Sequence, residues 1–319
     1  MSLPAAISHR LRLPLIAAPM FLVSGPDLVI ATSRAGVIGS FPTANCRTLK
    51  ELDDWLRRIT QATLETAPYA PNLIVHRSNH RLQDDLDLVA KHRAPLVIAS
   101  VGNPTPILDK IHAYGGLVFA DIASMRHAEK AITAGADGLI LLSAGAGGQT
   151  GWANPFAFVR AVREIYDGPI VLAGGVNDGI ALRATKTLGC DLAYMGTRFI
   201  ATRESMAADG YKDMLVSAGL DDVMLTSAFT GLPTNKLRPS IKRAGLDPND
   251  LPARGMINVS KDINPDKRPK RWKDIWSAGH SVAGVHDIPD VAELIDRLAV
   301  EYGVAGRVTG EPHEFRTPL

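Results

Sequence analysis

The chain has 319 residues, of which 46% are hydrophobic and 21% charged, and its formal net charge is +2. These values are typical of a globular protein with a substantial core. The 35 basic residues nearly balance the 33 acidic ones, which argues against nucleic acid or an anionic membrane as a main partner. No stretch reaches the ~18 consecutive apolar residues that a membrane helix needs. Cys46 and Cys190 show neither disulfide nor metal-ligand spacing, so we expect a cytoplasmic protein that binds no metal.

Short runs that are apolar throughout recur from residue 15 to residue 195, at intervals of roughly 20 to 35 residues. Such runs are typical of parallel strands buried on both faces. The predicted strands are 15–18, 37–40, 72–75, 96–100, 117–120, 138–142, 170–173 and 192–195. Helical periodicity between them predicts helices over 49–59, 82–89, 106–114, 126–134, 156–165 and 179–188. This alternation predicts an α/β fold, a (β/α)8 TIM barrel, with an open doubly wound sheet as the alternative.

The repeat stops after residue 204. We therefore predict a barrel over 1–206, completed by a closing helix over 287–303, and a smaller substrate or lid lobe over 207–286. Asp287 is the candidate cap of the closing helix. Within the lobe, 206–220 is expected to be helical and 223–232 extended. The basic run 267–271 is expected to be a solvated loop.

Glycine follows the last two predicted barrel strands. Gly174 and Gly175 come after one strand, and Gly196 and Thr197 come after the next. Glycines at these points let the backbone approach a ligand closely and offer N–H groups to an anion. Because the loops after strands seven and eight of a TIM barrel commonly bind phosphate, we predict a phosphate site here. Tight turns alone are the alternative explanation.

Other strand ends also carry candidate ligand contacts. Pro19 fixes a bend after the first strand, where the backbone of Met20 is available to the edge of a flat ring. Asn72 is polar where a barrel strand is usually apolar, and either a structural hydrogen bond or ligand contact explains it. The sixth strand leads into a glycine-rich stretch, 143–151, which is predicted to be a flexible loop against the ligand.

Several of these motifs occur in the order found in one family. They are Ala17-Ala-Pro-Met20, Gly135-Ala-Asp137, Ala146-Gly-Gly-Gln-Thr-Gly151, Ala173-Gly-Gly175, Asp178-Gly179, Met195-Gly-Thr-Arg-Phe199, Glu204-Ser205 and Trp276-Ser-Ala-Gly279. The chain thus resembles the nitronate monooxygenases, formerly called 2-nitropropane dioxygenases. The resemblance implies an FMN-binding TIM barrel with a smaller substrate lobe. The candidate cofactor-binding residues are Ala18, Pro19, Met20, Asn72, Asp121, Gly147, Gly148, Gln149, Ala173, Gly174, Gly175, Met195, Gly196 and Thr197.

The chain departs from the family at positions that bear on the reaction. Gln149 stands where the family usually has a catalytic histidine. Leu142 stands where a glutamine or aspartate is common, and Asp121 aligns with a lysine of some relatives. An amide has no titratable proton, so Gln149 cannot act as a general base. It can still donate a hydrogen bond to a substrate oxygen.

A second difference suggests that imidazole and amide have exchanged places. The late family element commonly reads Ala-Gly-Gln, whereas this chain has His280 after Ala278 and Gly279. We therefore predict that His280 and Gln149 are the catalytic residues and face the flavin from two loops. A loop histidine without a catalytic part is the alternative. If the ring of His280 lies away from the site, a reductase or a nitronate-only oxidase is expected instead.

The leading hypothesis is an FMN-dependent oxidation of alkyl nitronates by dioxygen to a carbonyl compound and nitrite. The alternative flavoenzyme is an NAD(P)H reductase of quinones or enoyl thioesters. A barrel that binds a phosphorylated metabolite without redox chemistry is a third hypothesis. The expected partners are a small-molecule substrate and dioxygen, and a homodimer is the expected assembly.

Overall fold

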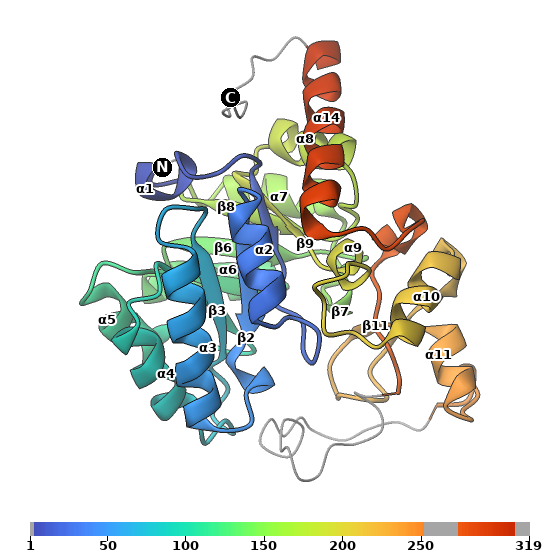
Figure 1. Ribbon diagram of the computed structural model, residues 1–319, viewed down its shortest axis with the longest axis horizontal. Coiled ribbons are helices and arrows are strands. Elements are labelled where there is room, and N and C mark those ends of the chain that lie inside the picture. The colour runs from blue at the N-terminus through green and yellow to red at the C-terminus, as the bar shows by residue number, and fades with distance from the viewer. Residues whose placement is uncertain (1–2, 252–273, 310–319) are drawn as a thin grey trace.

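A closed barrel of parallel strands forms the centre of the computed structural model, which describes residues 3–251 and 274–309 (Figure 1). Within these residues the barrel strands, in spatial order, are β1 (Leu15–Ala17), β2 (Ile38–Pro42), β3 (Tyr69–Ile74), β4 (Leu96–Ser100), β5 (Leu117–Ile122), β6 (Gly138–Leu142), β8 (Ile170–Ala173) and β9 (Leu192–Met195). The sheet closes where β9 pairs with β1, with Tyr194 opposite Ile16. The (β/α)8 TIM barrel predicted from the sequence is confirmed, and the open sheet is excluded.

Helices surround the barrel on its outer side (Figure 1). They are α1 (Ala5–Ser8), α2 (Pro26–Arg34), α3 (Leu49–Ala62), α4 (Leu82–Lys91), α5 (Thr105–His112), α6 (Met125–Ala134), α7 (Pro155–Arg163), α8 (Gly179–Leu188), the short α9 (Thr197–Ile200) and the long α14 (Val291–Thr309). The sequence analysis did not predict α2. The sequence does contain residues that favour a helix here. Pro26 occupies the first turn of α2, Asp27 lies near its N-terminus and Arg34 lies in its last turn.

The closing helix α14 packs against α2 and α8, and its apolar residues share a core cluster with theirs. Its cap differs from the prediction. Asp290 Oδ1 accepts a hydrogen bond from the backbone N–H of Glu293 at 2.8 Å, so Asp290 is the capping residue. Asp287 instead forms an ion pair with Arg198, at 2.5 Å, and a second one with Arg297.

The contact between α14 and α8 requires glycine at position 179. A Cβ added to Gly179 would lie 2.3 Å from the backbone nitrogen of Tyr302 and 2.4 Å from the carbonyl oxygen of Leu298. Neither atom belongs to a flexible side chain, so the two helices would have to separate. We expect Gly179→Ala to lower the free energy of unfolding by about 1–3 kcal/mol in urea titrations. Gly219→Ala, whose added Cβ has its nearest contact at 4.0 Å, should be close to neutral; equal losses in the two variants would contradict this interpretation.

The lobe lies beside the carboxyl ends of the strands (Figure 1). Its described elements are α10 (Asp209–Ser217), η2 (Leu220–Asp222), β10 (Val223–Thr226), β11 (Thr234–Leu237), α11 (Arg238–Arg243) and η4 (His280–Gly284). The stretch expected to be extended, 223–232, therefore contains β10 and the turn toward β11. The predicted basic loop 267–271 lies outside the described residues.

The barrel and the lobe share a second sheet. Among the described residues this sheet has the order β10-β11-β7, and β7 (Gly148–Gln149) is part of the glycine-rich stretch after β6. Gln149 lies opposite Thr234, and Gly148 lies opposite Asn235. Two residues of the stretch predicted to be a loop therefore form a strand, and their backbone pairs with the lobe.

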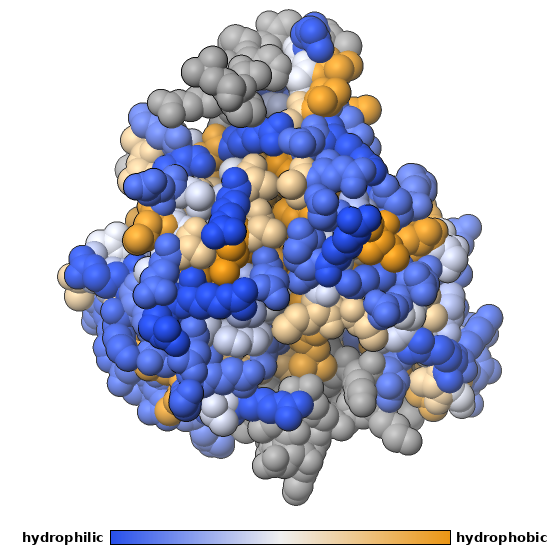
Figure 2. Space-filling model, viewed as in Figure 1, coloured by the Kyte–Doolittle hydropathy of each residue, from blue (hydrophilic) through white to orange (hydrophobic). Residues whose placement is uncertain are grey.

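The face in Figure 2 is largely hydrophilic, and its apolar side chains form separate small patches. None of the helices in the described part of the chain is long and apolar enough to cross a bilayer. Cys46 and Cys190 are both buried as free thiols, and burial raises the pKa of Cys190 to about 12.

Candidate active site

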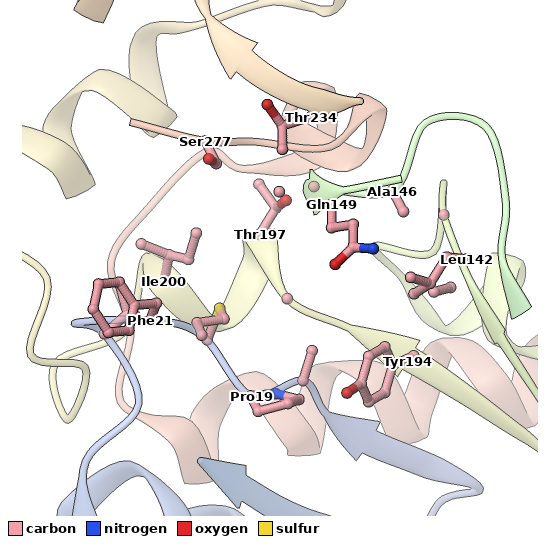
Figure 3. Close-up of a pocket in the computed structure, with 18 of the residues that line it drawn as sticks. Pro19, Phe21, Leu142, Ala146, Gln149, Tyr194, Thr197, Ile200, Thr234 and Ser277 are labelled. Atoms are coloured by element: carbon pink, nitrogen blue, oxygen red, sulfur yellow. The ribbon is translucent and has the colours of Figure 1, made fainter. Parts of the chain in front are cut away.

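A cavity of about 310 Å³ lies at the carboxyl ends of the barrel strands, between the barrel and the lobe (Figure 3). All of the predicted cofactor-binding residues except Met195 line it, namely Ala18, Pro19, Met20, Asn72, Asp121, Gly147, Gly148, Gln149, Ala173, Gly174, Gly175, Gly196 and Thr197. The strand ends of the barrel thus bring together residues that lie far apart in the sequence, as expected for this fold.

Met195 does not line the cavity. Its side chain is buried in the cluster between the barrel and the outer helices, together with Phe199 and Leu294. Side chains alternate between the two faces of a strand, so the residue before it, Tyr194, points into the cavity instead (Figure 3). The assignment of Met195 to the cofactor site is therefore wrong for its side chain.

Gln149 points from β7 into the cavity, toward Tyr194 and Leu142 (Figure 3). Its position is fixed from both sides. The amide of Asn235 donates a hydrogen bond to the carbonyl oxygen of Ala146 at 2.7 Å, and the hydroxyl of Thr150 donates one to the carbonyl oxygen of Ser143 at 2.8 Å. These hydrogen bonds hold the backbone around Gln149, from which its amide can be directed at a substrate oxygen.

The loop that contains His280 does meet the glycine-rich stretch, but the imidazole of His280 does not face the cavity. The backbone N–H of His280 donates to the carbonyl oxygen of Gly145 at 2.9 Å, and a Cβ added to Gly145 would lie 2.7 Å from Nδ1 of the ring. The ring is exposed and does not line the cavity. The predicted exchange of imidazole and amide over the cavity is therefore wrong.

Close backbone packing explains this placement. The backbone N–H of Gly279 donates to Oγ1 of Thr197 at 2.9 Å, and a Cβ added to Gly147 would lie 2.7 Å from that same nitrogen. Gly279 thus fills the space beside the cavity, and the next side chain is directed outward. Ser277 and Ser281 of this loop face the cavity in its place.

The ends of β8 and β9 lie where the sequence predicts a phosphate site. The two strands are neighbours in the barrel, with Ala173 paired to Tyr194, so the glycines that follow them lie at one edge of the cavity. Gly175 has a φ of 78°, and a Cβ added to it would meet no atom within 4 Å. Open space next to a left-handed backbone is the shape that an anion bound by backbone N–H groups needs.

The floor of the cavity carries buried polar atoms without partners. Among the described residues, Oδ1 of Asp121 and the hydroxyl of Tyr194 are buried and form no hydrogen bond. Burial raises the pKa of Asp121 to about 7. The pKa of Tyr194 is raised by burial and further by the negative charge of Asp121. Unpaired buried polar groups in a cavity indicate that a ligand completes their hydrogen bonds.

Asn72 forms structural hydrogen bonds, one of the two explanations that the sequence left open, and it also lies at the cavity. Its amide donates to the carbonyl oxygen of Ile98 at 3.2 Å and accepts from the hydroxyl of Ser100 at 3.3 Å. It also lines the cavity. The structural hydrogen bonds hold the amide in place at the edge of the site.

The lobe supplies the opposite wall. Tyr211 and Trp276 line it with stacked rings whose centroids are 4.8 Å apart, and the guanidinium carbon of Arg243 lies 3.5 Å from the Trp276 ring centroid. The hydroxyl of Tyr211 bonds to the backbone of Ser277. Lys236 of β11 also lines this wall and is fully buried. The sequence analysis missed Lys236 and Tyr194; a polar residue at an apolar strand position was the available signal for the latter.

A TIM barrel whose strand ends and covering lobe enclose one cavity defines an α/β-barrel enzyme. The sequence model of the family described as "Nitronate monooxygenase" matches residues 80–301. The chain belongs to the nitronate monooxygenase family, and it is an oxidoreductase.

Two relatives and one solved structure show how widely this likeness extends. The chain is 30% identical to a (3aS,4S,5R,7aS)-5-hydroxy-7a-methyl-1-oxo-octahydro-1H-indene-4-carboxyl-CoA dehydrogenase of Rhodococcus jostii, over 83% of this chain and 72% of that protein. It is 25% identical to a nitronate monooxygenase of Paraburkholderia phytofirmans, over 90% of this chain and 92% of that protein. The structure of FabK from Thermotoga maritima superposes with a TM-score of 0.80 at 24% identity, covering 96% of this chain and 98% of FabK.

Proposed function

We propose that this protein binds FMN and oxidises alkyl nitronates with dioxygen to carbonyl compounds and nitrite. In the net reaction two nitronates and one dioxygen give two carbonyl compounds and two nitrite ions. The observation that carries this proposal is the side chain of Gln149, an amide directed into the cavity (Figure 3). No histidine is found among the described residues that line the cavity.

The residues present fit FMN. Gly174, Gly175, Gly196 and Thr197 would hold its phosphate, since the open space at Gly175 lies where the loops of β8 and β9 meet the cavity. The unpaired atoms of Asp121 and Tyr194 would meet the polar groups of its ring system or ribityl chain. When bound, FMN supplies the redox chemistry by accepting electrons from the substrate and passing them to dioxygen.

The remaining chemistry falls to the side chains of this protein. A nitronate is already deprotonated at carbon, so its oxidation needs no general base. Gln149 would donate a hydrogen bond to a nitronate oxygen and orient the substrate. A neutral nitroalkane must first lose a proton from carbon, and an amide cannot accept it.

We therefore expect turnover of propyl-2-nitronate and little turnover of 2-nitropropane, measured as dioxygen consumption and nitrite release. Gln149→Leu should lower kcat/KM for the nitronate by about 10- to 100-fold, because it removes a hydrogen bond to a charged group. Gln149→His should gain activity on the neutral nitroalkane. Both variants must retain their FMN content. Equal turnover of the nitronate and the nitroalkane by the wild-type protein would contradict the proposed role of Gln149.

A second candidate is an FMN-dependent NAD(P)H reductase of quinones or enoyl thioesters. The similarity to the carboxyl-CoA dehydrogenase of Rhodococcus jostii favours it. Anaerobic mixing separates the two candidates. Bleaching of the flavin by nitronate, with none by NADH or NADPH, supports the first. Bleaching by NADH or NADPH alone supports the second.

A further inference from the structure

Lys236 occupies an unusual position for a lysine. It lies in β11, where side chains alternate between two faces. Thr234 and Lys236 line the cavity, whereas Asn235 bonds to the glycine-rich stretch and Leu237 packs in the core of the lobe. The side chain of Lys236 has 0% of its surface exposed. The alternation of the strand thus directs the amine of Lys236 into the wall of the cavity.

Burying a lysine side chain costs free energy that burying an apolar side chain does not cost. Nζ of Lys236 donates a hydrogen bond to the carbonyl oxygen of Ile275 at a distance of 3.5 Å. Burial lowers the pKa of Lys236 to about 7. An apolar side chain could fill this position in the cavity wall, so we look for the reason for a basic group here in what the cavity binds.

The charges of the cavity indicate the kind of ligand. Lys236 is the only basic side chain among the described residues that line the cavity, and its polar neighbours on the lobe wall include the neutral Thr230, Thr234 and Ser277. The carboxyl group among the lining residues, that of Asp121, belongs to the barrel strand β5. A single cation in a wall of low dielectric attracts a single anion strongly.

We propose that Lys236 binds the negatively charged oxygen atoms of the substrate and thereby selects small organic anions whose charge is delocalised from the reacting carbon, such as nitronates and enolates. This inference deepens the proposed function and rests on it for the reacting carbon. The amide of Gln149 and the ammonium group of Lys236 then contact the anion from β7 and β11, which are paired in one sheet.

The test compares anion binding and stability in the FMN-loaded protein. The probe is nitrate, a planar anion that resembles the nitronate head group and is not a substrate, and its Kd is measured by isothermal titration calorimetry. Lys236→Met keeps the length of the side chain and removes the charge. Lys242→Met, at an exposed lysine of α11, removes the same charge from the surface of the same lobe and is the matched control.

We expect Lys236→Met to weaken nitrate binding by about 10- to 100-fold, since a hydrogen bond to a charged group is lost. Lys242→Met should bind nitrate like the wild type. A purely structural lysine would give a lower Tm and an unchanged nitrate affinity, and that result would overturn the proposal. Lys236→Arg, which keeps a charge, should retain part of the nitrate affinity if it folds.

The outcome is separable from that of the proposed function. If nitrate binding depends on Lys236 but the wild-type protein does not oxidise nitronates, the anion site stands and the nitronate assignment fails. If nitronates are oxidised and Lys236→Met leaves both the nitrate affinity and the KM for nitronate unchanged, the anion site is wrong and the assignment stands.

Discussion

Replacing Gly175 by alanine is expected to weaken FMN binding by about 10- to 100-fold while the barrel stays folded. The added Cβ would enter the open space at the end of β8, because no protein atom lies within 4 Å of it. That space is where the proposed phosphate must sit, so the methyl group would displace it from the backbone N–H groups. Loss of charge-assisted hydrogen bonds accounts for the size of the effect.

The variant also carries backbone strain, which a matched control removes from the comparison. Gly175 has a φ of 78°, and alanine in the left-handed region costs about 1 kcal/mol. Gly115 has a φ of 83° and also has no atom within 4 Å of an added Cβ, but it lies in the turn between α5 and β5, outside the residues that line the cavity. Gly115→Ala should lose similar stability in urea and retain the FMN affinity of the wild type. An equal loss of FMN from both variants, measured by fluorescence titration of the apoprotein, would contradict the phosphate site.

The barrel and the glycines of the proposed phosphate site follow from local patterns in the sequence. Buried parallel strands are apolar throughout, and the glycines that follow two neighbouring strands mark one edge of the cavity. These signals need only a few consecutive residues. They therefore located Gly174, Gly175, Gly196 and Thr197 at the cavity before any tertiary contact was known.

The errors arise where distant backbone segments meet. The pairing of β7 with β11 joins Gln149 to Thr234, which lies far along the chain, and no local pattern shows it. His280 was misplaced for the same kind of reason. The direction of its side chain depends on the contact of Gly279 with Thr197 and Gly147, not on its distance from the cavity along the sequence.

Alternation within single strands explains the remaining differences. Tyr194 faces the cavity and Met195 faces the outer helices, although both end the same strand. Because β9 is otherwise apolar on both faces, the hydroxyl of Tyr194 was the available signal in its composition for a residue that points inward. For Lys236, the sequence shows a polar strand but not the covering residues that bury it.

Asp121→Asn is expected to stabilise the FMN-free protein at pH 8 much more than at pH 5. Burial raises the pKa of Asp121 from 3.8 to about 7, so the folded state holds a proton that the unfolded state has already released between these values. The free energy of unfolding therefore falls as the pH rises from about 4 to about 7, and the penalty is complete above pH 7. A shift of about 3 pH units corresponds to at most ~4 kcal/mol. Part of the side chain faces the open cavity, which reduces the effect. We therefore expect the pH-dependent loss in the free energy of unfolding to be about 2 kcal/mol.

An asparagine has nearly the same shape and cannot ionise, so the variant should lack this pH dependence. The free energies of unfolding of the wild-type protein and of Asp121→Asn are measured in urea at pH 5 and pH 8. The difference between the two proteins is then compared at the two pH values. Any cost of an unpaired amide in the variant is the same at both pH values and cancels. Asp84→Asn, at an exposed aspartate of α4, is the control and should show no such change. If Asp121→Asn differs from the wild type by the same amount at both pH values, the carboxyl group of Asp121 is ionised throughout, and the unpaired buried oxygen on the cavity floor must be satisfied by water.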